Sequence, residues 1–323
     1  MLLSKQILFC SPSFFNYEQF IINELQNLGA SVTFLSETHQ KKRTSDYESK
    51  FLQHLNSNCF DFIFVIKGEK LTKPCLEAIK RYKYGKTILL QYDTIKRYTW
   101  IKRLLPYFEN IYSFDHKDCI EYGFKFRPHF IPEDIYKLNT KKGIIENKIS
   151  IVCSFYYDRF IILKKLRTYF KRKVDFYIYI SRNKFLRNIH RLLPSDIFLL
   201  NYKKLSREEM LSHMINSSAV LDIEFEGQNG LTFRTLEALA LERKLITTND
   251  NIKSYKFYRD TNIFILSKDM SNLKELEVFL SIDIAPLTKE FYELYSIKKW
   301  CEDIFVYNRS SLDDHVSKLL VTR

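Results

Sequence analysis

Short apolar runs alternate with longer amphipathic segments along most of the chain. Between the first two runs, residues 17–28 place Phe20, Ile21, Leu25 and Leu28 on a helical period, and Gly29 follows as a terminator. This alternation predicts βα units and a parallel sheet. The strands expected in the first half are residues 6–11, 31–35, 61–66, 87–92, 110–114 and 125–130.

The alternation of apolar runs and amphipathic segments is interrupted after residue 126, where two prolines are followed by a polar, charged stretch. It then resumes. We therefore place a linker at about residues 131–148. The domains expected are residues 1–135 and 136–323, which predicts an α/β fold of two Rossmann-like domains facing a central cleft. The strands expected in the second half are residues 149–154, 174–180, 197–201, 219–225, 244–248 and 262–266. Ser206 and Glu209 fit a capping box that opens the helix before residue 217.

The composition is that of a globular protein, because 46% of the 323 residues are hydrophobic and 15% are aromatic. The 51 Lys and Arg exceed the 38 Asp and Glu and give a formal net charge of +13. Such a surface attracts nucleotide phosphates, anionic lipids or nucleic acid, and the charge alone does not choose among them.

The six cysteines do not indicate a metal site or a disulfide framework, because none forms a CxxC pair or stands at a ligand-like spacing from a histidine. The first residues lack the basic region and apolar stretch of a signal peptide. No window approaches 18 uncharged apolar residues. A cytoplasmic location is expected.

The most informative stretch is residues 221–249, where an expected strand ends, a loop with two of the seven glycines follows, and a helix begins near Thr232. Such loops lie at the carboxyl edge of a parallel sheet, and helix N-termini there favour phosphate. Arg234 and Glu237 are three residues apart and share one face of that helix. An arginine can clamp a diphosphate and a carboxylate can accept ribose hydroxyls, but an Arg234–Glu237 ion pair explains the same spacing.

The stretch resembles the donor-binding signature of GT-B glycosyltransferases, and residues 230–240 with 245–249 are similar to bacterial lipopolysaccharide-core and capsular-polysaccharide transferases. The resemblance extends over most of the chain. Its other pieces are residues 14–17, 91–93, 113–115, 127–130, 151–154 with Arg159, and 295–300.

The resemblance implies a nucleotide-sugar donor held mainly by the second domain and an acceptor held by the first. Glu237 matches the carboxylate that holds the ribose, and Arg234 matches a phosphate or sugar contact near Gly230. Ser154 and Arg159 match the loop that meets the diphosphate. The last helix is expected to cross back onto the first domain.

One departure from the family pattern concerns a second glutamate. Many retaining GT-B enzymes have two glutamates separated by seven residues, but Asn229 stands at that position here and the nearest upstream glutamate is Glu226. We keep Glu226 as a donor-site candidate. The stereochemical outcome stays open.

Candidates for a catalytic base follow strands of the first half. Asp93 ends an expected strand and is our choice for the base beside the acceptor hydroxyl, with a helix cap as the alternative. Asp115 has a stronger claim to be a cap, for a short helix that ends at Gly123. His129, beside Pro128, fits an inert loop position better than a cleft-lining one.

The sequence lacks the common motifs that bind a divalent metal ion or the phosphates of a nucleotide. No Asp-x-Asp triplet follows a strand, and neither GxGxxG nor a GxxxxGK[ST] loop occurs. Asp222 and Glu224 alternate on one strand, and we interpret them as local polar contacts. A metal-independent hexosyl- or deoxyhexosyltransferase without a cofactor other than its donor is expected.

Basic residues gather in two runs, eight Lys or Arg against one Asp in residues 80–103 and ten against one in residues 164–191. A solvated helix face is the usual origin of such runs. If they have a role, attachment to the anionic inner leaflet suits a transferase that builds lipopolysaccharide, capsule or a related cell-surface glycan. No nucleic-acid partner is expected. The alternatives are a non-catalytic nucleic-acid-binding protein, for which no consensus motif appears, and a silent scaffold.

Overall fold

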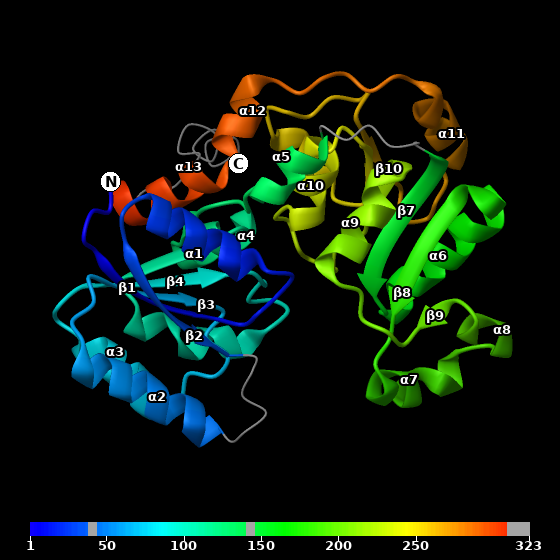
Figure 1. Cartoon of the computed structure of the whole chain (residues 1–323). Coiled ribbons are helices and arrows are strands. Elements are labelled where there is room, and N and C mark those ends of the chain that lie inside the picture. The colour runs from blue at the N-terminus through cyan, green and yellow to red at the C-terminus, as the bar shows by residue number, and fades with distance from the viewer. Residues whose placement is uncertain (38–43, 140–145, 309–323) are drawn as a thin grey trace. The chain divides into compact units, whose positions relative to one another are not determined.

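The computed structural model describes residues 1–37, 44–139 and 146–308. They form two compact units (Figure 1). The first comprises Met1–Pro132, the short segment Glu226–Leu231 and the described residues from Glu293 onwards. The second comprises Glu133–Phe225 and Thr232–Tyr292.

The first unit is built on a parallel sheet of six strands in the order β2-β1-β3-β4-β5-β6. Its strands are β1 (Gln6–Ser11), β2 (Ser31–Ser36), β3 (Phe62–Ile66), β4 (Lys86–Gln91), β5 (Asn110–Ser113) and β6 (Lys125–Phe126). Its helices include α1 (Tyr17–Asn27), α2 (Thr44–Ser57), α3 (Lys73–Arg81) and α4 (His116–Tyr122), with the 3-10 turns η1 (Thr99–Arg103) and η2 (Leu105–Tyr107).

The two faces of this sheet are covered by different parts of the chain. Leu8, Ile63 and Leu89 pack with residues of α2 and α3 on one face. On the other, the ring of Phe64 contacts Trp300 and Phe305 at centroid distances of 6.2 and 5.1 Å. The covering elements are α13 (Ile297–Cys301) and the π-helical turn η6 (Glu302–Val306). α13 and η6 follow α12 (Lys289–Leu294) in the chain and pack in the first unit, which is where the last helix was expected.

The second unit repeats the architecture, with six parallel strands in the order β12-β11-β10-β7-β8-β9. The strands are β7 (Glu146–Ser154), β8 (Val174–Tyr179), β9 (Leu200–Asn201), β10 (Ser217–Asp222), β11 (Lys244–Thr247) and β12 (Ile263–Ile265). The helices are α5 (Glu133–Asn139), α6 (Tyr157–Phe170), α7 (Arg182–Asn188), α8 (Pro194–Ile197), α9 (Arg207–Ile215), α10 (Phe233–Ala240) and α11 (Leu273–Ser281), with the 3-10 turns η3 (Lys171–Lys173), η4 (Ile189–Arg191) and η5 (Asp250–Ser254).

The twelve strands expected from the sequence all occur, and all except β1 begin or end at different residues from those expected. Residue Ile197 was expected in a strand but ends α8, because Pro194 opens that turn and the Asp196 carboxylate accepts a bond from the Leu193 amide. The expected strand over 125–130 is only two residues long. The capping box is confirmed: Ser206 Oγ accepts from the Glu209 amide and Glu209 Oε2 accepts from the Ser206 amide.

The expected linker at residues 131–148 is mostly taken up by regular structure. α5 occupies Glu133–Asn139 and β7 begins at Glu146, whereas residues 140–145 of this expectation lie outside the described part of the chain. The first and longest stretch of the first unit ends at Pro132, three residues before the boundary expected at 135. In the part of the chain that the structure describes, no helix has the length and apolar character needed to cross a membrane.

Candidate functional site

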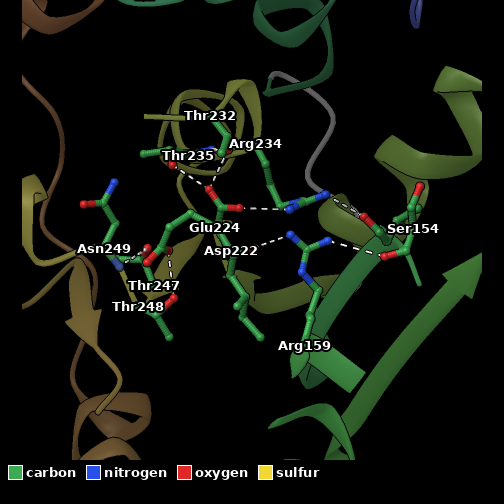
Figure 2. A network of polar contacts seen from close by, with 12 residues as sticks. Ser154, Arg159, Asp222, Glu224, Thr232, Arg234, Thr235, Thr247, Thr248 and Asn249 are labelled. Carbon is green, nitrogen blue, oxygen red and sulfur yellow. Dashed lines mark hydrogen bonds and ion pairs between the residues drawn. The ribbon is translucent and has the colours of Figure 1, made fainter. Parts of the chain in front are cut away.

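A network of polar side chains lies at the carboxyl edge of the second sheet (Figure 2). β7, β10 and β11 are neighbours in that sheet and all run parallel, so their C-terminal residues meet at one edge. Ligands bind at this edge in open α/β sheets. The chain reaches it at Ser154, Asp222 and Thr247.

Asp222 organises the start of α10. Its buried carboxylate accepts bonds from Thr232 Oγ1 at 2.5 Å and Thr235 Oγ1 at 2.7 Å, and it forms an ion pair with Arg234 at 2.9 Å. Thr232 also caps the helix, because its hydroxyl accepts from the Thr235 amide. The carboxylate therefore fixes both the first turn of the helix and the direction of the Arg234 side chain.

Two arginines point into this network, as Figure 2 shows. Arg234 donates to the Val152 carbonyl at 2.6 Å as well as to Asp222. Arg159, from α6, donates to the carbonyls of Ile223 at 2.5 Å and Ser154 at 3.4 Å. Burial lowers the pKa of the Arg159 guanidinium, whose ordinary value is high enough that it stays charged.

The charge balance of the edge follows from these partners. Asp222 neutralises one guanidinium, whereas Arg159 is held by carbonyl oxygens that carry no net charge. The guanidinium of Arg159 also lies over the rings of Tyr156 and Phe225, at 5.5 and 5.0 Å from their centroids. An anion that replaces the carbonyl oxygens gains charge-assisted bonds, so the arrangement suits a phosphate.

Glu224, which was expected to make only local polar contacts, adds a titratable group to this edge. It follows β10 and accepts a bond from Thr248 Oγ1 at 2.7 Å. Burial, the largest cause, raises the pKa of its carboxyl group to about 7. The sequence pattern that could have predicted this position is the alternation of Asp222 and Glu224 at the end of an expected strand. A carboxylate just past a parallel strand lies at the edge where ligands bind.

Glu237 lies apart from this network although it shares α10 with Arg234. Its side chain is 1% exposed, and its carboxylate accepts a 2.9 Å bond from Arg207. The same guanidinium makes two bonds to Asp134, at 2.6 and 2.8 Å. The Arg234–Glu237 ion pair considered above is therefore wrong, because each residue has a different partner. The ribose role of Glu237 stays a prediction from the resemblance.

The loop that holds Gly227 and Gly230, residues Glu226–Leu231, belongs to the first unit. Asp115 accepts bonds from the amides of Asn229 at 2.7 Å and Gly230 at 2.9 Å, and its other oxygen caps α4. A Cβ atom on Gly230 would lie 2.3 Å from the Phe114 carbonyl oxygen, so no other residue fits without movement. Glu226 is exposed in the same segment. Capping by Asp115, with Gly123 in the left-handed region at the helix end, is confirmed.

Asp93 follows β4 in the first unit and does not cap a helix, so that alternative is wrong. Its carboxylate pairs with Lys67 at 2.9 Å and Arg97 at 3.0 Å. The Ile95 amide instead donates to Asp118. His129 is buried between the rings of Phe114 and Tyr92, and burial lowers its pKa to about 3, which fits the inert position.

The described residues contain no cluster of three or more His, Cys, Asp or Glu side chains that could hold a metal ion. The carboxylates of the second edge are each engaged by hydroxyls or arginine instead. Cationic side chains are therefore the groups that could meet an anionic ligand at this site.

Comparisons with solved structures identify the fold. An α-glucosyltransferase in complex with UDP and a 13-mer DNA has a TM-score of 0.61 at 13% identity, over 98% of this chain and 99% of that one. A lipopolysaccharide outer core galactosyltransferase, WaaB, gives 0.56 at 11% identity, over 94% and 100%. UDP-GlcNAc 2-epimerase from Methanocaldococcus jannaschii gives 0.56 at 9% identity, over 94% and 99%. No protein-family model and no curated protein sequence matches the chain.

With two Rossmann-like units, each a parallel sheet of six strands, the chain has the GT-B fold of these structures. At such low identity the likeness establishes the fold alone. Fold does not determine chemistry, so function must be argued from the site.

Proposed function

We propose that the protein is a glycosyltransferase that moves a sugar from a nucleotide-sugar donor to a cell-surface glycan acceptor. The observation that carries the proposal is the pair of guanidinium groups, Arg159 and Arg234, at the carboxyl edge of the second sheet. The similar structures include an α-glucosyltransferase in complex with UDP and a lipopolysaccharide galactosyltransferase, and both support a nucleotide-sugar donor.

The donor diphosphate would lie against the two arginines and the exposed end of β7 at Ser154. Phosphate oxygens would replace the carbonyls of Ile223 and Val152 as partners of the two guanidinium groups. In the transfer step the bond between the anomeric carbon and the diphosphate oxygen breaks, and its electron pair leaves with the diphosphate. Fixed positive charge at that oxygen stabilises the transition state, so the proposed chemistry needs no metal ion.

The acceptor hydroxyl must lose its proton as its oxygen bonds to the anomeric carbon. We assign this proton to Asp93 for an inverting transfer. The pairs with Lys67 and Arg97 hold the Asp93 carboxylate in place. Asp93→Asn should lower kcat at least a hundredfold with donor KM unchanged. A variant that turns over normally and only melts earlier would show that Asp93 is structural.

The donor is the first point to test, by calorimetric titration of the purified protein with UDP, dTDP, GDP and CDP. Selective binding of one nucleoside diphosphate supports the proposal. Binding of none contradicts it and favours a scaffold or a nucleic-acid-binding protein, which the charge of +13 would otherwise allow.

Product analysis then separates glycosyl transfer from the other reactions of this fold. With the preferred donor, we expect release of the nucleoside diphosphate only when glycan precursor from a strain lacking the gene is added. Interconversion of sugar nucleotides without acceptor would identify an epimerase, and transfer to duplex DNA would identify the acceptor as nucleic acid. The anomeric configuration of the product would also decide between inversion and retention, and its sugar between hexosyl and deoxyhexosyl transfer.

The proposed acceptor is lipopolysaccharide, capsule or a related glycan built at a membrane, which suits a peripheral protein on an anionic inner leaflet. The two basic runs of the sequence motivate this location. Binding to vesicles of anionic lipid that weakens with salt would support it, whereas equal binding to neutral vesicles would contradict the electrostatic account.

A further inference from the structure

The segment between β8 and α9, residues 182–204, exposes an unusual number of large apolar side chains. Among the described residues, seventeen large hydrophobic side chains are exposed, and six of them fall in these 23 positions. Phe198 is 90% exposed, Leu186 66% and Leu193 59%. The other three are Ile189, Ile197 and Tyr202. Exposed apolar side chains that gather in one short segment mark an interaction site more often than scattered single residues do.

The exposure does not come from a segment detached from the core. Phe185, Leu192 and Leu199 pack against the hydrophobic core of the second unit. Lys164 of α6 also pairs with the buried carboxylate of Asp196 at 2.6 Å, and the Phe185 ring packs edge-on against Tyr202. The segment therefore has an inner apolar face that is satisfied and an outer apolar face on a fixed backbone. α7 and α8 lie together at one end of the second unit (Figure 1).

The charge around the outer face is strongly positive. Residues 182–204 contain six Lys or Arg and one acidic residue, and that residue is the buried Asp196. Arg182, Arg187 and Arg191 are exposed on the same α7–η4 stretch as Leu186 and Ile189. Interleaved cations and apolar side chains are the composition of elements that lie in the headgroup region of an anionic bilayer.

We propose that residues 182–204, the α7–α8 surface, insert their outer apolar side chains into an anionic lipid surface. Nucleic acid is the less suitable partner, because phosphate backbones are met by cationic and polar side chains and offer nothing to cover Phe198, Leu186 and Leu193. Cationic side chains alone would suit either an anionic lipid surface or nucleic acid, so the exposed apolar side chains are what favour lipid.

The α7–α8 surface adjoins the candidate donor site within the second unit. Lys184 of α7 lies 3.4 Å from the ring centroid of Tyr156, and the Arg159 guanidinium lies over the same ring. If the proposed function holds, this surface brings the donor edge close to lipid-linked acceptors. The lipid contact itself needs neither donor nor acceptor, so it can be tested separately.

The test is cosedimentation of the whole protein with vesicles of phosphatidylcholine containing phosphatidylglycerol, and with phosphatidylcholine alone. Replacing Leu186, Leu193 and Phe198 together by Ser should reduce the partition coefficient at least tenfold. Arg182→Gln with Arg187→Gln should reduce it about fivefold for each charge removed. These side chains are exposed, so the variants should melt like the wild type.

The matched controls lie elsewhere on the chain. Val278→Ser removes a side chain that is 64% exposed on α11, and Arg81→Gln with Lys83→Gln removes two charges of the other basic run. Val278→Ser should bind vesicles like the wild type, and the Arg81→Gln, Lys83→Gln variant should lose less binding than the Arg182→Gln, Arg187→Gln variant. Equal loss in the controls, or an apolar triple variant that still binds, would overturn the proposal. Binding of a short DNA duplex that is lost in the same triple variant would also overturn it and assign the surface to nucleic acid. UDP binding in every variant reports separately on the proposed function.

Discussion

The charged side chains at the carboxyl edges of the two sheets have different kinds of partners. In the first unit, Asp93 sits between two cations and Asp115 is surrounded by four backbone amides, so each acid is saturated by the protein itself. In the second unit, among the described residues, Arg159 donates hydrogen bonds to the backbone carbonyls of Ser154 and Ile223, which carry no net charge. Asp115 thereby fixes the backbone and Asp93, the proposed base, is held in position, whereas a cation with neutral partners can exchange them for an anion. We therefore call the second edge the ligand-binding edge, and the first the structural edge, after the loop that Asp115 holds.

The largest effect is expected at the structural edge, where Gly230 packs against Phe114. Gly230→Ala places a Cβ atom 2.3 Å from a carbonyl oxygen and must displace the loop from Asp115. Two broken charge-assisted bonds and the steric conflict should lower the free energy of unfolding by about 3–5 kcal/mol, measured by urea denaturation.

Gly123→Ala is the control for this variant. Gly123 has a positive φ, of 70°, and nothing lies within 4 Å of a Cβ atom there. Its loss should be about 1 kcal/mol, from backbone strain alone. Equal losses in the two variants would show that the close approach to Phe114 contributes nothing.

At the ligand-binding edge, Arg234→Lys and Arg159→Lys should each weaken the binding of the preferred nucleoside diphosphate about 30-fold, or ~2 kcal/mol. An ammonium keeps the charge but cannot make the forked contacts of a guanidinium. Calorimetry measures the loss. Arg259→Lys is the matched control, because this exposed arginine of the same unit donates to the Pro286 carbonyl away from the network. Wild-type affinity in both site variants would remove the arginines from the donor site.

Glu237 tests whether the ligand-binding edge extends along α10. Because its carboxylate is buried against Arg207, Glu237→Gln should lower the free energy of unfolding by about 1.5 kcal/mol, with Asp134 still compensating the guanidinium. Thermal melts and nucleotide titration of the same variant separate the two roles. A carboxylate that only supports Arg207 would leave the affinity unchanged. A tenfold weaker affinity with normal melting would instead support the ribose contact implied by the resemblance.

The sequence predicted the strands because their apolar runs are local, and it predicted the capping box of Ser206 and Glu209 because spacing alone defines such a box. It could not predict that Arg234 and Glu237 turn to different partners, since those partners, Asp222 and Arg207, come from other elements of the unit. The attachment of Gly230 to Asp115 joins residues 115 positions apart in the chain. Such contacts depend on tertiary packing, which periodicity does not encode.

The smallest effect concerns the pH dependence of donor binding. Because burial raises the pKa of Glu224 to about 7, the side chain is neutral below that pH and adds a negative charge to the ligand-binding edge above it. A nucleotide sugar keeps two negative charges across this range, so its affinity should fall on the order of threefold as the pH rises through about 7.

The free energy of unfolding should also fall as the pH rises. The folded-state pKa lies above the ordinary value of 4.5, so the folded protein binds the proton more tightly and loses free energy of unfolding as the pH rises from about 4.5 through about 7. Glu224→Gln should flatten both the pH profile of donor affinity and the pH profile of stability.

Glu37 provides the matched control, since burial also raises its pKa, to about 8, and it follows β2 at the structural edge. Glu37→Gln should change the stability profile and leave the pH dependence of donor binding as it is in the wild type. If Glu37→Gln flattens the binding profile and Glu224→Gln does not, the assignment of the two edges is reversed.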